Sequence, residues 1–415
     1  MEVMFDRACG LDVHRDTIVA CFLAGANEAR PKKEVRTFRT HTRGLFELRD
    51  WLLEQKVAAI AMESTGVYWK AIYGVLETET WSLVVANAEH VKKVPGRKTD
   101  VKDAEWLARL LRSGLLRASF VPPPPIRDLR ELSRYRTKLV QERVRERTRT
   151  IKVLEAANVK LAGTISDVFG VSGVAMLHAL AAGTSTPRAI AELAKGRMRK
   201  KIDALEVALD SRLTEVHREM LRIALRRLER ADEDIRDVET LIEMRLSPYA
   251  VEREKLDQIP GVDRTVATAI LAELGPDMSA FPSAGHVASW AGVCPGKDES
   301  AGRQRSGRPA SGNHHLKTLL CEAAHAASKQ RGSYLKDKFH RLKARRGHKR
   351  AIIAIAHKIL VAAYHVLSGK RDYRDLGPNY LDELDRTRTA KRLTSRLQAL
   401  GFSVALSPAG PAAPG

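Results

Sequence analysis

The hydrophobic pattern of the first 120 residues alternates between strand-like and helix-like segments. Apolar and β-branched runs between polar turns predict strands in RACGLDV, DTIVACFLAG, EVRTFRT, VAAIAMES and WSLVVAN. Leucines recur at helical spacing over residues 41–55, and helices are also predicted in TGVYWKAIYGVLE, directly after Glu63, and over residues 101–113. The pattern predicts an α/β domain over residues 1–121, which ends at the proline run of residues 122–125.

Beyond this proline run the periodicity is helical. Apolar residues repeat every three or four positions over residues 126–154 and again over residues 201–245, with charges between them. Within a region spanning residues 122–250, these segments predict an antiparallel helical hairpin or a dimerising coiled coil. An ordinary solvated helix pair fits the same pattern. The intervening residues 155–200 carry no functional signal.

A third region, residues 251–375, begins with two short helical segments around Ile259-Pro260-Gly261-Val262. This arrangement is typical of a helix-hairpin-helix, in which backbone N–H groups at Gly261 would face a phosphate. Asp263 stands where such motifs usually have a second glycine, so a plain packing hairpin is the alternative. Residues 376–415 form a C-terminal extension, and its last segment, LSPAGPAAPG, is predicted to be disordered.

Composition indicates a polyanionic partner. The chain has 71 Lys and Arg against 50 Asp and Glu, a formal net charge of +21. Such an excess favours nucleic acid over a small acidic metabolite. Arginines crowd residues 126–154, where Arg143 and Arg147 are candidates for contact with a nucleic-acid backbone.

Cysteine and histidine usage gives little sign of a soft metal site or an oxidising compartment. The 4 cysteines have no CxxC spacing, which argues against structural zinc and against a disulfide framework. His357 and His365 lie in an apolar helical segment and read as packing or phosphate-contacting residues rather than zinc ligands. The first residues lack the apolar core of a signal peptide, and no apolar run approaches the roughly 20 residues of a membrane span. We expect a soluble, cytoplasmic protein.

Four acids in three contexts form the candidate catalytic site. Asp12 and Glu63 follow apolar runs, where an unpaired carboxylate is costly, and Asp103 lies in the first turn of the helix predicted over residues 101–113. Asp100 is predicted in the same first turn, three residues before Asp103, which puts both carboxylates on one face of the helix; on its own Asp100 would read as a helix N-cap. Oxygen-only ligands favour Mg²⁺ or Mn²⁺, and acidic metal sites in a basic chain favour chemistry on phosphate. The four acids together predict a nuclease-like metal site.

A segment rich in serine, glycine and arginine is the second candidate for chemistry. In ESAGRQRSGRPASGN, Ser300 and Ser306 stand among Arg303, Arg305 and Arg308, which predicts a flexible, positively charged loop before a helix starting near Asn313. Such a loop usually makes passive contacts with nucleic acid. A serine hydroxyl that attacks a phosphodiester beside metal ions is the sharper alternative.

The motifs CGLDVHRD, AMESTGVYW, KTDVKDAEWLARLL, LDQIPGV, WAGVCPG and ESAGRQRSGR resemble, in this order, the DEDD transposases of the bacterial insertion-sequence 110/1111 class. The resemblance implies an N-terminal ribonuclease-H/RuvC-like mixed-sheet domain, central coiled-coil helices and a C-terminal helical transposase domain. It also implies recombination of double-stranded DNA directed by a non-coding bridge RNA. By the same resemblance Asp12, Glu63, Asp100 and Asp103 would hold magnesium, and Ser300, with Ser306 as the alternative, would be the nucleophile.

The acids and the serine lie far apart in the sequence, which favours a composite site in a homodimer or tetramer. Two rival functions remain. A metal-dependent junction resolvase would use the acids without a serine intermediate, and a non-catalytic nucleic-acid-binding protein would use neither.

Overall fold

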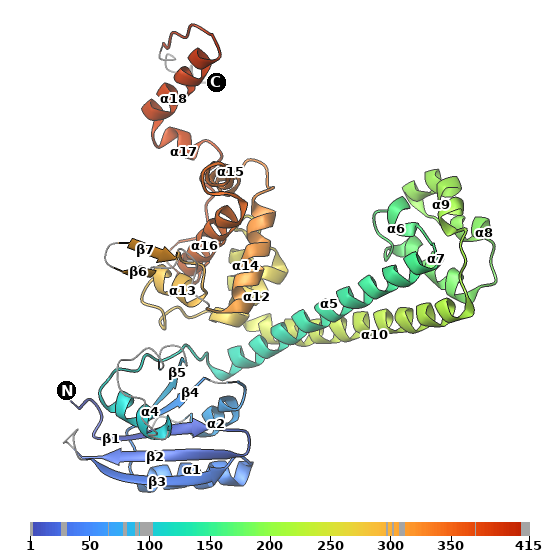
Figure 1. Ribbon diagram of the computed structural model, residues 1–415. Coiled ribbons are helices and arrows are strands. Elements are labelled where there is room, and N and C mark those ends of the chain that lie inside the picture. Colours follow the sequence, from blue (N-terminus) through green and yellow to red (C-terminus); the bar gives the residue numbers. More distant parts are fainter. Residues whose placement is uncertain are drawn as a thin grey trace. The chain divides into compact units, whose positions relative to one another are not determined.

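The computed structural model describes residues 3–25, 31–64, 66–77, 81–87, 91, 103–295, 298–300, 303–306, 312–369 and 371–407. For residues 298–300 and 303–306 the description covers the backbone alone. The chain divides into two compact units, an N-terminal unit, Met1–Val121, and a C-terminal unit, Pro122–Gly415 (Figure 1). Asp100, Arg308 and residues 408–415 of the tail lie outside the described residues, so the predictions made for them remain untested.

A mixed five-stranded sheet forms the centre of the N-terminal unit. Its strands are β1 (Arg7–Val13), β2 (Thr17–Ala24), β3 (Lys32–Arg39), β4 (Ala59–Glu63) and β5 (Ser82–Ala86). The strand order is β3-β2-β1-β4-β5; β1, β2 and β3 are antiparallel neighbours, and β1, β4 and β5 run parallel. This order places β1 and β4, the two strands that carry predicted acids, next to each other.

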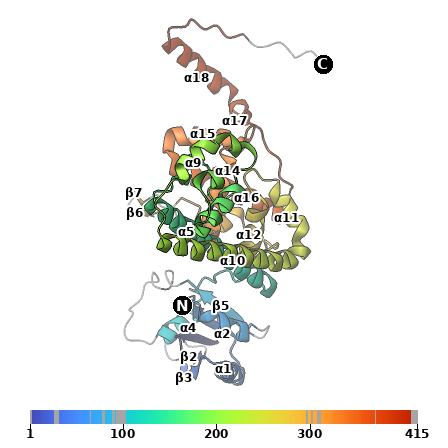
Figure 2. The same ribbon diagram turned by 90° about the vertical axis from the view of Figure 1, so that its right-hand side faces the viewer.

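Helices cover both faces of this sheet (Figures 1 and 2). On one face α1 (Thr42–Glu54) and α2 (Trp69–Leu76) pack against Cys9 and Leu11 of β1, and on the other α4 (Asp103–Arg112) packs against Ala8. Side chains alternate between the two faces of a strand, so both layers are buried by one set of short apolar runs. α2 begins at Trp69, which corrects the predicted start directly after Glu63, because residues 66–68 form a turn first.

Gly10 sets the distance between α4 and the sheet. A Cβ on Gly10 would lie 2.1 Å from the carbonyl oxygen of Ala104 and 2.5 Å from the backbone nitrogen of Ala108. These distances are far below van der Waals contact, so only glycine allows the helix backbone to rest directly on β1. Ala104 and Ala108 are fully buried, and their small side chains permit the same close approach.

Two long helices form the central part of the C-terminal unit. They are α5 (Pro124–Ala156) and α10 (Glu215–Leu246), and they pack side by side along most of their length. Ion pairs show that they are antiparallel, because Arg136 near the start of α5 pairs with Glu239 late in α10, while Arg143 pairs with the earlier Asp232. Of the arrangements predicted from the sequence, the structure shows the antiparallel helical hairpin, formed by α5 and α10 of one chain.

The segment between the two long helices folds as a small helical subdomain, here called the tip (residues 157–213). It contains α6 (Leu161–Thr164), α7 (Val171–Ala182), α8 (Pro187–Ala191), the 3-10 helix η1 (Gly196–Lys201) and α9 (Ile202–Leu209). The long helical tract predicted over residues 201–245 is interrupted at residues 210–214, so it consists of two separate helices. Leu205 and Leu209 belong to α9 and pack in the core of the tip. A new helix, α10, begins at Glu215 and is preceded by a capping box formed by Thr214 and His217.

The remaining residues form a helical region. Its helices are η2 (Ser247–Tyr249), α11 (Ala250–Asp257), α12 (Arg264–Leu274), α13 (Ala284–Trp290), α14 (His314–Ala327), α15 (Tyr334–Arg346), α16 (His348–Leu367), α17 (Tyr380–Glu383) and α18 (Arg386–Ala399). A short hairpin, β6 (Asp298–Ser300) and β7 (Arg303–Ser306), lies in sequence between α13 and α14. Among the described residues α16 alone is long and apolar enough to cross a membrane; half of it is buried inside the fold, where it packs on α13, α14 and α15, as expected of a core helix.

The close contact at Gly10 makes the N-terminal unit sensitive to a single methyl group. We expect Gly10→Ala to lower the free energy of unfolding of this unit by about 1–3 kcal/mol, since the sheet and α4 must move apart. Denaturant titration followed by tryptophan fluorescence measures this change, because Trp51, Trp69, Trp81 and Trp106 all lie in this unit.

Gly74→Ala is the matched control, because a Cβ there meets nothing within 4 Å and the residue lies inside α2. It should leave stability unchanged or raise it by up to about 1 kcal/mol through helix propensity. Equal stability of the two variants would show that α4 does not rest on Gly10 as described.

Candidate active site

Two of the predicted acids meet at the ends of adjacent parallel strands. β1 and β4 pair in the register Leu11↔Met62, and Asp12 and Glu63 are the next residue on each strand. Leu11 and Met62 point into the core that α1 covers, so alternation directs Asp12 and Glu63 toward the face that α4 covers. The strand pairing therefore brings these two carboxylates side by side.

The first residue of helix α4 is a third acid, and it lies toward the same C-terminal ends of β1 and β4. The backbone N–H of Met4, just before β1, donates to the carbonyl oxygen of Arg112 at 2.8 Å, so the C-terminal end of α4 lies over the start of β1. The N-terminal end of α4 therefore points toward the end of β1, where Asp12 stands. Asp103 is the first residue of α4 and is exposed.

These acids differ in their surroundings. Asp12 and Glu63 are half-buried, and Nε2 of the exposed His14 lies 3.1 Å from Oδ2 of Asp12. Among the described residues no group of three or more His, Cys, Asp or Glu side chains is close enough to hold a metal ion, and Asp100 lies outside them. Carboxylate oxygens are nevertheless the donor set that Mg²⁺ and Mn²⁺ prefer, so the chemistry of these side chains fits a hard divalent cation.

Glu105, two residues after Asp103, has a structural role that the sequence did not reveal. Its side chain is 10% exposed and forms ion pairs with Lys33 of β3 and with Arg109 one turn along α4. Burial alone would raise the pKa of Glu105, but hydrogen bonds from Lys33 and Arg109 hold it below its ordinary value. Glu105 thus stays ionised, and its ion pair with Lys33 connects α4 to the edge strand β3.

The serine-rich segment is a β-hairpin over part of its length rather than the flexible loop predicted. Ser300 in β6 pairs with Arg303 in β7, and Ser306 in β7 pairs with Asp298 in β6. Arg305 lies on β7 between these positions. Ladder hydrogen bonds thus give the backbone of both candidate serines a defined pairing.

Asn313, the last residue of this segment, is hydrogen-bonded to a buried carboxylate. Asn313 caps α14, accepting from the N–H of Leu316, and its Nδ2 donates to Oε2 of Glu273 at 2.6 Å. Glu273 of α12 has only 3% of its side chain exposed and also accepts two hydrogen bonds from Arg134 of α5, at 2.7 and 2.9 Å. One carboxylate therefore joins α5, α12 and the start of α14.

Burial and the neighbouring charges shift the pKa values of Glu273 and Arg130 in opposite directions. Burial would raise the pKa of Glu273, but Arg134 and Arg130 hold it below its ordinary value. Burial lowers the pKa of Arg130 to about 10, and the Glu273 carboxylate opposes that shift. Glu273 and its arginines were missed by sequence reasoning, although an acid inside the apolar run ATAILAEL is the same kind of signal that marked Glu63.

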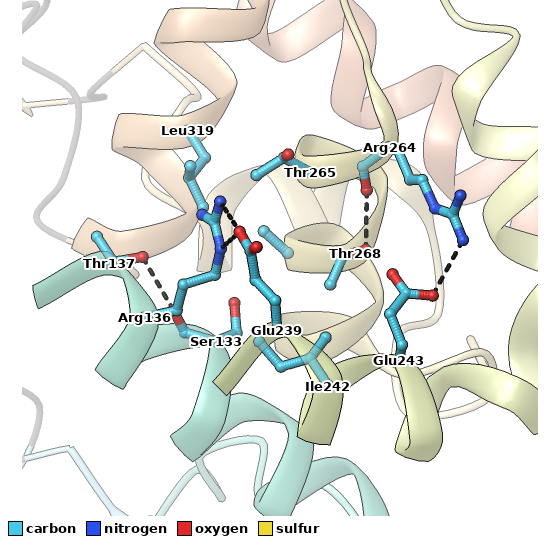
Figure 3. A pocket seen from close by; sticks show the side chains of 11 residues that line it. Ser133, Arg136, Thr137, Glu239, Ile242, Glu243, Arg264, Thr265, Thr268 and Leu319 are labelled. Carbon is cyan, nitrogen blue, oxygen red and sulfur yellow. Dashed lines mark hydrogen bonds and ion pairs between the residues drawn. The ribbon is translucent and has the colours of Figure 1, made fainter. Parts of the chain in front are cut away.

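A cavity of about 440 Å³ lies beside this cluster, between α5, α10, α12 and α14 (Figure 3). Its charged side chains neutralise one another. Arg136 pairs with Glu239 at 2.6 Å, and Arg264 pairs with Glu243 at 3.0 Å. The cavity therefore has no surplus charge to attract an ionic substrate.

Three residues predicted to contact nucleic acid have packing or pairing partners. Arg143 of α5 pairs with Asp232 at 2.6 Å, and Arg147 lies over the ring of Phe169 in the tip, 5.1 Å from its centroid. A Cβ on Gly261 would lie 2.2 Å from the carbonyl oxygen of Ala323 in α14, so this glycine serves close helix packing. Asp263 caps α12 by accepting from the N–H of Val266, which explains an acid in place of a second glycine. Nucleic-acid contact at these residues stays a prediction.

Taken together, the N-terminal unit is a ribonuclease-H-like domain with acids at the ends of its central strands, followed by a mostly helical unit. Residues 9–159 match the IS110-type DEDD family whose description is "Transposase", and residues 253–340 match "Transposase IS116/IS110/IS902 family". The chain belongs to the IS110 family of DEDD transposases, enzymes that transfer DNA strands. No curated protein matches the chain.

The buried cluster predicts a large cost for removing one charge. We expect Glu273→Gln to lower the free energy of unfolding of the C-terminal unit by about 3 kcal/mol, because Arg130 and Arg134, with 14% and 31% of their side chains exposed, would lose the buried carboxylate that they share. Far-ultraviolet circular dichroism during denaturation follows this helical unit. Glu239→Gln, which breaks the more exposed pair with Arg136, should cost no more than about 1 kcal/mol.

The difference in unfolding free energy between the wild-type chain and Glu273→Gln should decrease at acidic pH. The pKa of Glu273 lies below the ordinary value of 4.5 for a glutamate, because Arg134 and Arg130 stabilise the carboxylate, so its charge stabilises the folded state above about pH 4.5. As pH falls through the lowered pKa the carboxylate takes up a proton and that stabilisation is lost. The gap in stability between the wild-type chain and Glu273→Gln should be constant near neutral pH and shrink below pH 4.5. A gap that widens on acidification would contradict this assignment.

Proposed function

We propose that this transposase cuts and joins DNA with Asp12, Glu63, Asp100 and Asp103 as ligands of Mg²⁺ or Mn²⁺ and with Ser300 as the nucleophile. The observation that carries the metal site is the pairing of β1 with β4, which places Asp12 and Glu63 next to each other on the face that α4 covers. Asp103 opens that helix.

Each side chain has a distinct role in the proposed reaction. A cation held by the four acids would supply Lewis-acid polarisation of the scissile phosphate. The Ser300 hydroxyl attacks phosphorus, the bond to one DNA strand breaks, and the released strand end leaves as a hydroxyl. The phosphoserine bond stores the energy of the broken phosphodiester, so a different strand end can attack it and be joined without another energy source.

Arginines of the serine segment support this role. Ser300 pairs with Arg303 across the hairpin, and Arg305 follows on the same strand. With Arg308 they would clamp the phosphate, since guanidinium groups bind phosphate oxygens in pairs. A bridge RNA that guides the choice of DNA, and a homodimer or tetramer that joins acids of one copy to the serine of another, belong to the same proposal.

The nucleophile is tested by comparing serine variants. Ser300→Ala should reduce cleavage of a DNA substrate carrying the element's own ends by at least about 10³-fold and abolish the covalent protein–DNA adduct seen on denaturing gels. Ser306→Ala is the matched control and should keep the adduct. Loss of the adduct in Ser306→Ala alone would move the nucleophile there. Full cleavage by Ser300→Ala without an adduct in either protein would favour the resolvase-like alternative, in which activated water cuts.

The acids are tested in the same assay. Glu63→Gln and Asp103→Asn should each reduce cleavage by at least about 10²-fold while DNA binding in the absence of metal is retained. Unchanged cleavage would show that the acids hold no catalytic metal and would exclude the proposed site.

The guide is tested by what the protein retains. When the chain is expressed together with the DNA that flanks its reading frame and purified in moderate salt, one dominant structured RNA from that flank should copurify with it. Random cellular RNA, or none, would count against guidance and leave an unguided transposase.

A further inference from the structure

A groove rich in arginine runs along the packed helices α5 and α10. It encloses about 550 Å³ and receives arginines from both helices, namely Arg143, Arg145, Arg149, Arg226, Arg227 and Arg230. The lining also includes apolar side chains, among them the buried Leu139 of α5 and the exposed Ile223 of α10. No single stretch of sequence contains this set, because the two helices are separated by the tip.

One buried acid fixes the position of two of these arginines. Glu146 of α5 is 8% exposed and pairs with Arg149 one turn away at 2.9 Å. It also lies 3.8 Å from Arg227 on the facing helix. Glu146 thus holds one guanidinium of each helix at the groove, and both remain largely exposed, at 64% and 63% of their side chains.

Two arginines in the groove, Arg145 and Arg226, have no acidic ion-pair partner among the described residues. Both of these side chains are exposed. The lining has six arginines against three acids, Glu142, Glu146 and Asp234. Arg143 is paired with Asp232 outside the lining, Glu146 is shared by Arg149 and Arg227, and Asp234 lies 3.9 Å from Arg230. The positive charge left over in the groove is therefore that of Arg145 and Arg226.

The other cavity on the same two helices gives a direct comparison. Beside α12, Arg136 and Arg264 each face a glutamate, and the lining is balanced at two arginines and two glutamates (Figure 3). The lining near α12 is therefore balanced in charge, although Glu243 also pairs with Arg253 outside it, whereas the lining of the groove is not balanced. The surplus is local, and helix packing does not require it.

We propose that this groove binds the phosphodiester backbone of a nucleic acid. Arginines that project from both helices toward one concave surface suit a chain of phosphates, because each planar guanidinium can donate two hydrogen bonds to one phosphate. The packed helices hold these donors on a rigid support. The site requires neither the serine nor the metal of the proposed reaction, and DNA and RNA share the chemistry that it recognises.

The test uses the full-length protein and removes the two arginines that have no ion pair. We expect Arg145→Gln with Arg226→Gln to weaken binding of a random-sequence duplex several-fold. The slope of log affinity against log salt should also fall by about 2, since each phosphate contact on duplex DNA contributes about 0.9. Fluorescence anisotropy in EDTA, with a DNA duplex and an RNA duplex as separate probes, measures both quantities without strand cleavage. Replacing both arginines by lysine should restore most of the slope, because charge is retained.

The control is Arg236→Gln with Arg245→Gln, which removes the same charge from exposed positions of α10 outside the groove. A smaller slope for the groove variant than for this control, on either probe, supports the site, and the probe that responds identifies the nucleic acid. Equal slopes on both probes would overturn the proposal. A change in self-association measured by sedimentation, with equal slopes, would instead assign the groove to contact with a second copy of the chain. Neither result alters what Ser300→Ala and Glu63→Gln report about catalysis.

Discussion

The C-terminal unit depends on one buried carboxylate. Glu273 is nearly inaccessible to water and receives hydrogen bonds from Arg134 of α5 and Asn313 at the start of α14. A charge in that environment is tolerated only when it is fully paired, so the three elements must come together in one arrangement. Because Asn313 is the last residue of the serine-rich segment, its hydrogen bond to Glu273 also fixes where that segment ends.

The N-terminal unit depends on a steric constraint instead. Gly10 has no side chain, so α4 rests directly on β1. The start of this helix, Asp103, therefore lies toward the C-terminal ends of β1 and β4, which carry Asp12 and Glu63. Glu105 supports this placement through Lys33 and Arg109. Two interactions therefore position α4. The contact at Gly10 sets the distance of the helix from the sheet, and the ion pair between Glu105 and Lys33 fixes the helix relative to β3.

The helix pair shows how charge is divided between stability and binding. Where α5 and α10 approach α12, the lining of the cavity in Figure 3 has two arginines and two glutamates. Arg136 pairs with Glu239, and Arg264 pairs with Glu243, which also pairs with Arg253 outside the lining. Farther along, Glu146 is shared by Arg149 and Arg227, and Arg145 and Arg226 remain without ion pairs among the described residues. Unpaired guanidinium groups repel one another, so their concentration in one groove is best explained by an anionic partner.

Local patterns in the sequence determined the five strands, helix α1, helix α5 and the family motifs, because alternation, helical period and short motifs are properties of neighbouring residues. The same local reasoning failed over residues 201–245, where leucines of α9 continued the helical spacing but pack in the tip. Only the tertiary structure decided that Glu63 lies beside Asp12, that Gly261 serves helix packing, that Glu273 meets Arg134, and that Arg145 and Arg226 share a groove. Each of these depends on contacts between segments far apart in the chain, whose register and facing surfaces are set by packing and leave no trace in local spacing.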